Sequence, residues 1–245
     1  MKAIILCAGL GKRMKPYTDD YQKTMLPFKG KPVLEFIIEG IKRAGIHDFI
    51  LVVGYRKEQI IDYFQDGRNW GIKIDYIEQK SLNGTGEAVL LCEKLIDNSV
   101  FFLTWGDTLV SYDVYKEVIE IYRNENPDFI LVGNLVDDPY KGAAIYLNNQ
   151  YCSEIIEKPP KGTSSTNINN AGIFLLSKKI FNVLKKQKTS VRGEIEIPES
   201  IRFGMKHLNW QVRVFKMSKD HFYGDFGDLN EYEKLKNDSR WFELS

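Results

Sequence analysis

Apolar runs and amphipathic stretches alternate along the first half of the chain. Continuous or alternating apolar residues predict strands at 3–7, 49–53, 72–77, 100–104 and 129–133. Apolar residues at helical spacing predict helices between these strands, at 32–44, 57–64, 88–95 and 112–123. This order is typical of a mixed, mostly parallel, Rossmann-like sheet flanked by helices, so the predicted fold class is α/β.

The second half of the chain has a less regular pattern. Residues 211–215 alternate and predict an outer strand, and residues 193–197 are expected to form the first turn of a helix. No stretch has the composition of a linker, and the length suits one large domain, so we expect a single domain over 1–245.

Composition narrows the choice of partners and compartment. The formal net charge is +1, and no apolar run reaches the roughly eighteen residues of a membrane span, so we expect neither a nucleic-acid nor a membrane partner. The three cysteines, Cys7, Cys92 and Cys152, are scattered, which is typical of buried thiols in a reducing cytoplasm. The amino terminus enters a core strand without a cleavable apolar segment, so the expected localisation is cytoplasmic.

The first strand leads into a loop with two glycines, residues 8–11, which Arg13 and later Lys23 follow. Open α/β sheets bind ligands at the carboxyl ends of their strands, and glycines let backbone N–H groups approach phosphate oxygens. The loop is not a P-loop, because no Ser or Thr follows Gly11-Lys12, and Met14 replaces the third glycine of the dinucleotide fingerprint. The sequence therefore predicts a different kind of nucleoside triphosphate site.

A longer string identifies the site. Residues 8–27 contain A-G-x-G-x-R-[ML]-x-P-x-T and then K-x-[ML]-L-P. This string resembles the sugar-1-phosphate nucleotidyltransferases, also called NDP-sugar pyrophosphorylases. The resemblance implies the nucleotide-diphospho-sugar transferase fold type and transfer of a nucleotidyl group from a nucleoside triphosphate to a sugar-1-phosphate, with release of pyrophosphate. One departure is that the family often has Pro-Lys-Pro where this chain has Gln22-Lys23-Thr24.

The resemblance also implies roles for single residues. In that family the glycine loop wraps the triphosphate, the arginine holds the leaving pyrophosphate, and the lysine contacts phosphate. Arg13 and Lys23 are therefore expected to be catalytic. The implied nucleotide-binding residues are Leu6, Ala8, Gly9, Gly11, Gln79 and Gly84.

Gln79, five positions before Gly84, is the implied contact to the base. A carboxamide offers one donor and one acceptor, which suits the adjacent N3–H and carbonyl of uracil or thymine. A carboxylate would suit guanine instead, so UTP or dTTP is favoured over GTP. A shift of one residue would place Glu78 at this position.

Asp107 follows the strand at 100–104 and lies beside Gly106. Mg²⁺ prefers one or two carboxylates together with substrate phosphates. The resemblance implies that Asp107 is catalytic and binds the metal, with Asp225 as the second metal ligand. The expected cofactor is Mg²⁺.

Three segments of the second half resemble the part of the family that binds the sugar phosphate. By this resemblance residues 1–110 form the nucleotide-binding half and residues 111–245 the sugar-phosphate-binding half. The implied substrate-binding residues are Gly142, Glu157 and Lys158 of an E-K-P tripeptide, and Asn170 and Gly172 of N-A-G-[IT]-[FY].

Several alternatives stay open on the sequence alone. The chain could be a cytidylyl- or guanylyltransferase acting on a heptose-1-phosphate or on a non-sugar phosphate such as phosphocholine. It could also be a glycosyltransferase or a nucleotide-binding regulatory subunit without activity. The expected partners are small-molecule substrates. Relatives are often dimers or tetramers, and the sequence leaves open whether this chain forms a homo-oligomer. The residues select neither the sugar nor UTP over dTTP.

Overall fold

The computed structural model describes residues 1–190, 192–227 and 229–240. Two compact units make up the chain, and their segments interleave. Unit 1 comprises residues 1–82, 104–117 and 220–245, and unit 2 comprises residues 83–103 and 118–219. The chain passes between the units within strand β6 (Val100–Trp105) and within helix α5 (Tyr112–Glu125).

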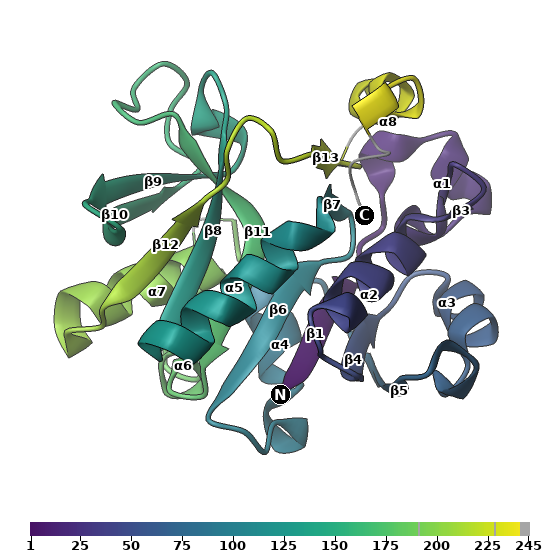
Figure 1. Ribbon diagram of the computed structural model, residues 1–245, viewed down its shortest axis with the longest axis horizontal. Coiled ribbons are helices and arrows are strands. Elements are labelled where there is room, and N and C mark those ends of the chain that lie inside the picture. Colours follow the sequence, from purple (N-terminus) through teal and green to yellow (C-terminus); the bar gives the residue numbers. More distant parts are fainter. Residues whose placement is uncertain (191, 228, 241–245) are drawn as a thin grey trace. The chain divides into compact units, whose positions relative to one another are not determined.

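Unit 1 contains the predicted alternation of parallel strands and helices. Its parallel strands are β1 (Lys2–Cys7), β4 (Asp48–Val53) and β5 (Lys73–Glu78), and the connecting helices include α2 (Val33–Arg43) and α3 (Lys57–Phe64). β1 pairs with β4 and β4 with β5, so that Cys7, Val53 and Glu78 are aligned at the carboxyl edge (Figure 1). The loops that follow these strands therefore gather at one edge of unit 1.

Short elements cover this edge of unit 1. They are α1 (Tyr17–Asp20), the 3₁₀-helix η2 (Lys23–Met25), the paired strands β2 (Pro27–Phe28) and β3 (Lys31–Pro32), and α8 (Leu229–Lys236). A second antiparallel pair joins β7 (Thr108–Val110) to β13 (Tyr223–Asp225), with Asp225 aligned to Thr108. This pair brings the last part of the chain beside Asp107.

Unit 2 is built on strands that mostly pair antiparallel. These are β8 (Phe129–Leu135), β9 (Ala143–Asn148), β10 (Tyr151–Glu157), β11 (Ile168–Ser177) and β12 (Val212–Lys216). β8 pairs with β11 on one side and with β12 on the other. β12 also pairs with β10, so the prediction of an outer strand was wrong. The alternation at 211–215 marks a strand with one covered face, which does not exclude neighbours on both edges.

Two helices of unit 2 begin elsewhere than the sequence predicts. α4 (Thr85–Leu90) begins before residue 88, and α7 (Ile197–Leu208) begins after an extended Glu196 with φ −119° and ψ 135°. The segment before α7 pairs with the segment before α4: Ile195 N donates to Asn83 O at 2.8 Å, and Gly86 N donates to Ile195 O at 2.8 Å. These long-range hydrogen bonds keep residues 193–196 out of the helix. The shorter helix of this unit is α6 (Ile180–Leu184).

The cysteines are structural, as expected. Cys7, Cys92 and Cys152 are buried and free, and burial raises the pKa of each thiol. None of the helices within the described residues has both the length and the apolar character needed to cross a bilayer.

Candidate active site

The glycine loop of unit 1 follows β1 directly. Gly11 has φ +62°, and a Cβ there would lie 2.7 Å from Thr18 Cγ2. Thr18 Oγ1 donates to Gly11 O at 2.9 Å, and Met14 N donates to the same oxygen at 2.8 Å. Gly9, in contrast, has open space around its missing side chain. Gly11 thus closes the turn, while Gly9 leaves backbone accessible to a ligand.

Four charged side chains of the predicted site lie together in unit 1. Lys23, on η2, forms an ion pair with Asp107. Phe226 N donates to Asp107 O at 2.9 Å, which places Asp225 next to Asp107. Burial and the negative charge of Asp107 raise the pKa of Asp225, and the positive charges of Lys23 and Arg13 oppose this increase, so Arg13 belongs to the same electrostatic cluster. We call Arg13, Lys23, Asp107 and Asp225 the charged cluster.

The carboxylate of Asp225 is costly to ionise in the folded protein. The residue is exposed to solvent, yet its carboxylate is partly desolvated by the protein around it. This desolvation and, as the second cause, the negative charge of Asp107 raise the pKa of Asp225 to about 6. A carboxylate whose ionisation is opposed by a neighbouring carboxylate fits a site for a divalent cation between the two. Among the residues that the structure describes, no group of three or more His, Cys, Asp or Glu side chains forms a metal site. A cation held here would take its other ligands from substrate phosphate and water.

Gln79 lies at the same edge of unit 1, one residue after β5. Its backbone N donates to Val53 O at 2.8 Å, and its side chain is buried. The neighbouring Glu78 is exposed and forms an ion pair with Lys57 at 2.6 Å. The alternative in which Glu78 contacts the base would have to break this ion pair.

Gly84, the other expected base contact, lies in unit 2 and has a structural reason to be glycine. Its φ is +103°, and a Cβ there would lie 2.4 Å from Ile195 O. The Gly84 turn therefore packs against the segment that ends at Glu196.

Gly84→Ala is expected to destabilise the protein by about 2–4 kcal/mol, the combined cost of a strained φ and a backbone clash. Thermal unfolding followed by circular dichroism measures this effect. Gly162→Ala is the matched control, because Gly162 has φ +74° but open space around it, so only the strain remains. Equal losses in the two variants would contradict the clash.

The predicted substrate residues of unit 2 meet at the ends of β9 and β10. Glu157, the last residue of β10, pairs with Ala143, and Lys158 N donates to Gly142 O at 2.7 Å. Burial raises the pKa of Glu157, and the positive charges of Lys158 and Arg192 oppose this increase. Gly142, Glu157 and Lys158 thus form one local constellation.

Asn170 and Gly172 lie at an irregularity of β11. Asn170 pairs with Gly133 of β8, and its Oδ1 accepts a hydrogen bond from Gly172 N at 3.1 Å. The neighbouring Asn169 pairs with Ala144 of β9, and its buried Oδ1 accepts no hydrogen bond from the described residues. An amide oxygen of this kind can accept from a ligand hydroxyl. Of the two neighbouring asparagines, the motif had pointed only to Asn170.

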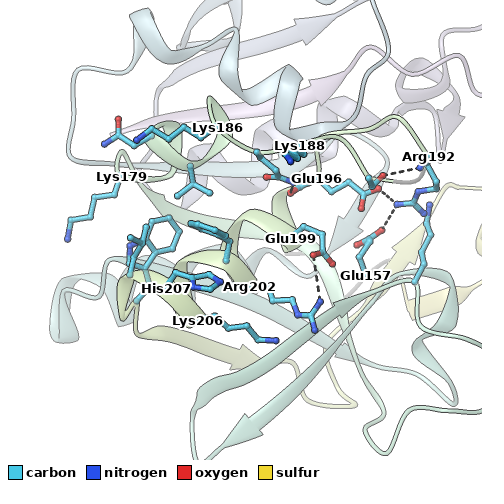
Figure 2. Close-up of a pocket in the computed structure, with 18 residues that line it drawn as sticks. Glu157, Lys179, Lys186, Lys188, Arg192, Glu196, Glu199, Arg202, Lys206 and His207 are labelled. Atoms are coloured by element: carbon cyan, nitrogen blue, oxygen red, sulfur yellow. Dashed lines mark hydrogen bonds and ion pairs between the residues drawn. The ribbon is translucent and has the colours of Figure 1, made fainter.

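Arg192 is a site residue that the sequence did not reveal. Its guanidinium contacts Glu157 Oε1 at 3.3 Å and forms an ion pair with Glu196, as Figure 2 shows. Both contacts lie at one end of a cavity of about 1360 Å³ in unit 2. Phe203 and His207 of α7, and Trp210 just after it, also line this cavity. The only local signal in the sequence was an Arg-Gly pair before a predicted helix.

Comparison with known proteins decides the family. The sequence model of the nucleotidyl transferase family matches residues 2–240. The chain belongs to this family. A bifunctional protein GlmU from Methanocaldococcus jannaschii is 36% identical over 251 residues, which cover 97% of this chain and 56% of that protein. The chain thus spans about half the length of the curated relatives it matches, and the prediction of a sugar-1-phosphate nucleotidyltransferase family member is confirmed.

Solved structures confirm the predicted fold. A protein described as a glucose-1-phosphate thymidylyltransferase from Bacillus anthracis is 26% identical, with a TM-score of 0.87 over 96% of this chain and 94% of that chain. A UDP-glucose pyrophosphorylase bound to UDP-glucose has a TM-score of 0.86 over 100% of this chain and 99% of that chain, at 24% identity. The family member described here therefore has the α/β fold of the nucleotide-diphospho-sugar transferases.

Proposed function

We propose that the protein transfers a nucleotidyl group from a nucleoside triphosphate to a sugar-1-phosphate and releases pyrophosphate. The observation that carries this proposal is the charged cluster beside the glycine loop at the carboxyl edge of unit 1. Two cations and two carboxylates at this place suit a triphosphate and its counter-ion. Unit 2 offers three groups to a sugar phosphate: the carboxylate of Glu157 as an acceptor, the ammonium group of Lys158, and the backbone of Gly142.

The reaction needs no general base. The second pKa of a phosphate monoester is about 6, so the attacking oxygen is already ionised at neutral pH. What the residues supply is in-line positioning and compensation of charge. Arg13 stabilises the leaving pyrophosphate, Lys23 contacts the phosphate under attack, and Lys158 orients the sugar phosphate.

The cofactor proposed is Mg²⁺, held by Asp107 and Asp225. Two carboxylates with the remaining ligands from phosphate and water match the usual coordination of this ion. When bound, Mg²⁺ would neutralise charge on the triphosphate. The buried free cysteines suit a reducing compartment, and we place the protein in the cytoplasm.

For the nucleotide we propose UTP or dTTP, on the strength of the Gln79 amide. Gln79→Glu is expected to shift the ratio of kcat/KM from UTP towards GTP by about 10–100-fold, because a mismatched hydrogen bond in a buried site costs about 1–3 kcal/mol. Steady-state kinetics with both nucleotides measures the ratio. Glu78→Gln is the matched control and should leave it unchanged; a shift with Glu78→Gln instead would move the base contact to residue 78.

The overall proposal is tested by release of pyrophosphate in the presence of Mg²⁺. UTP, dTTP, CTP, GTP and ATP are each combined with a panel of sugar-1-phosphates and with phosphocholine. Release that requires both a sugar-1-phosphate and UTP or dTTP supports the reaction and the nucleotide. Release with CTP or GTP and a sugar-1-phosphate would support the reaction but reject the argument from Gln79. Release with phosphocholine alone would reject a sugar-1-phosphate as the acceptor. No release with any pair would reject the proposed function.

A further inference from the structure

A fully buried amide lies directly under the segment that carries Lys23. Gln22 precedes η2, and its side chain has no exposure to solvent. A buried amide is costly unless its donor and acceptor atoms are satisfied. Such a residue therefore needs an explanation beyond filling space.

Both the nitrogen and the oxygen of the Gln22 side-chain amide make hydrogen bonds. Nε2 donates to Cys7 O at 2.5 Å, and Oε1 accepts from Thr24 N at 2.5 Å and from Thr24 Oγ1 at 2.6 Å. The backbone of Gln22 makes two further hydrogen bonds: its N donates to Gln59 Oε1 at 2.6 Å, and its O accepts from Met25 N at 2.8 Å. A network satisfied in this way rigidifies the groups it joins.

These contacts join three parts of the candidate site. Cys7 is the last residue of β1, immediately before the glycine loop, and Thr24 belongs to η2. A Cβ on Gly106 would lie 2.7 Å from Cys7 Sγ and 2.9 Å from Thr24 Cγ2, so the turn with Asp107 packs on the same two residues. Gln22 thus ties Lys23 to the strand end and to the turn that carries its ion-pair partner.

We propose that Gln22 is a positioning residue: its buried amide fixes η2 so that the Lys23 ammonium is held at Asp107, ready for the triphosphate. This inference rests on the proposed nucleotidyl transfer, in which Lys23 is catalytic. Because the Gln22 side chain is fully buried, its contribution is transmitted through the placement of Lys23.

The local backbone shows how the same placement can be reached without the amide. Gln22 has φ −64° and ψ 138°, and the preceding Tyr21 has φ −111° and ψ 141°, values that suit proline and the residue before it. The backbone N–H of Thr24 donates to the Gln22 amide. A proline at both positions 22 and 24 removes the Thr24 N–H donor together with its Gln22 acceptor.

The test compares three purified variants with the wild-type chain. Gln22→Met keeps the volume but removes the amide, and the double variant Gln22→Pro with Thr24→Pro replaces hydrogen bonds by rigid φ angles. Gln59→Met is the matched control, since it removes the amide that accepts from Gln22 N but leaves the Gln22 side chain in place. All assays are run at least 15 °C below the lowest melting temperature of the set, where every variant is folded.

We expect Gln22→Met to lower kcat about 10–100-fold and to weaken UTP or dTTP binding, with the KM for sugar-1-phosphate within twofold of wild type. The double proline variant is expected to recover kcat to within about threefold, and Gln59→Met to stay within twofold. If the amide served only stability, Gln22→Met would lower the melting temperature without lowering kcat at an unchanged KM for sugar-1-phosphate. The double proline variant would then have no loss of kcat to recover. A Gln22→Met variant with wild-type kcat and nucleotide affinity overturns the inference.

Calorimetric binding of UTP or dTTP without an acceptor separates this inference from the proposed function. If wild type binds nucleotide but transfers nothing, the reaction is rejected, and weaker binding by Gln22→Met still supports the placement of Lys23. If wild type neither binds nor transfers, both are rejected together.

Discussion

Replacing Asp107 by Asn is expected to lower kcat by at least about 10²–10³-fold while the protein stays folded. The carboxylate forms the ion pair with Lys23 and is a proposed metal ligand, so its loss removes two preorganised charge contacts at once. Since Asp107 also raises the pKa of Asp225, the same change should bring that pKa closer to its ordinary range. Arg13→Ala is expected to cause a loss of similar size, because it removes the cation for the leaving pyrophosphate.

Pyrophosphate release under saturating substrates measures the loss, and circular dichroism reports the fold. Asp62→Asn is the control, because Asp62 is an exposed carboxylate on α3 outside the charged cluster. Activity of Asp107→Asn above one tenth of wild type would remove Asp107 from the catalytic machinery.

Mg²⁺ affinity is expected to fall about tenfold per pH unit below about pH 6, because a metal ligand must be deprotonated and Asp225 takes up its proton there. Titration of the protein with Mg²⁺ from pH 5 to pH 8, in the presence of UTP or dTTP, measures this slope. Asp225→Asn should bind Mg²⁺ weakly and with a flatter pH profile. A wild-type affinity that does not change across this range would contradict the assignment of Asp225.

Asp225→Asn should also make the metal-free protein more stable at neutral pH. Folding raises the pKa of Asp225 from 3.8 to about 6, so the folded state holds the proton to higher pH than the unfolded chain. The free energy of unfolding therefore decreases as pH rises through this interval and stays lower above it. Because the carboxyl meets solvent, we expect a gain of about 1 kcal/mol from the substitution, well below the roughly 3 kcal/mol of two full pKa units.

The motifs of unit 1 were readable because each is compact in sequence. The strand and glycine loop that precede Arg13 follow directly from an apolar run and two glycines. Asp107 was readable because it closely follows an apolar strand and adjoins a glycine, whereas its ion pair with Lys23 is known only from the structure. For the first strand, the glycine loop and Arg13, residues that are close in sequence are also close in space.

Features that depend on distant partners were not readable. Arg192 contacts Glu157, which lies 35 positions away in the sequence, and the residues around Arg192 do not predict that contact. The start of α7 is set by hydrogen bonds to residues 83–86, and the neighbours of β12 are set by β8 and β10. The buried amide of Gln22 was visible only as a departure from prolines. Its meaning required the contacts to Cys7 and Thr24.

The interleaved segments of unit 1 have a consequence for synthesis on the ribosome. The glycine loop emerges first, Asp107 follows more than ninety residues later, and Asp225 comes only with the segment that begins at residue 220. Because β13 aligns Asp225 with β7, both carboxylates of the charged cluster cannot be in place until that last segment has left the exit tunnel. A chain that stops before residue 220 therefore carries only Asp107 of these two carboxylates, and a metal ion held by both, as proposed, could bind only after the later segment has folded.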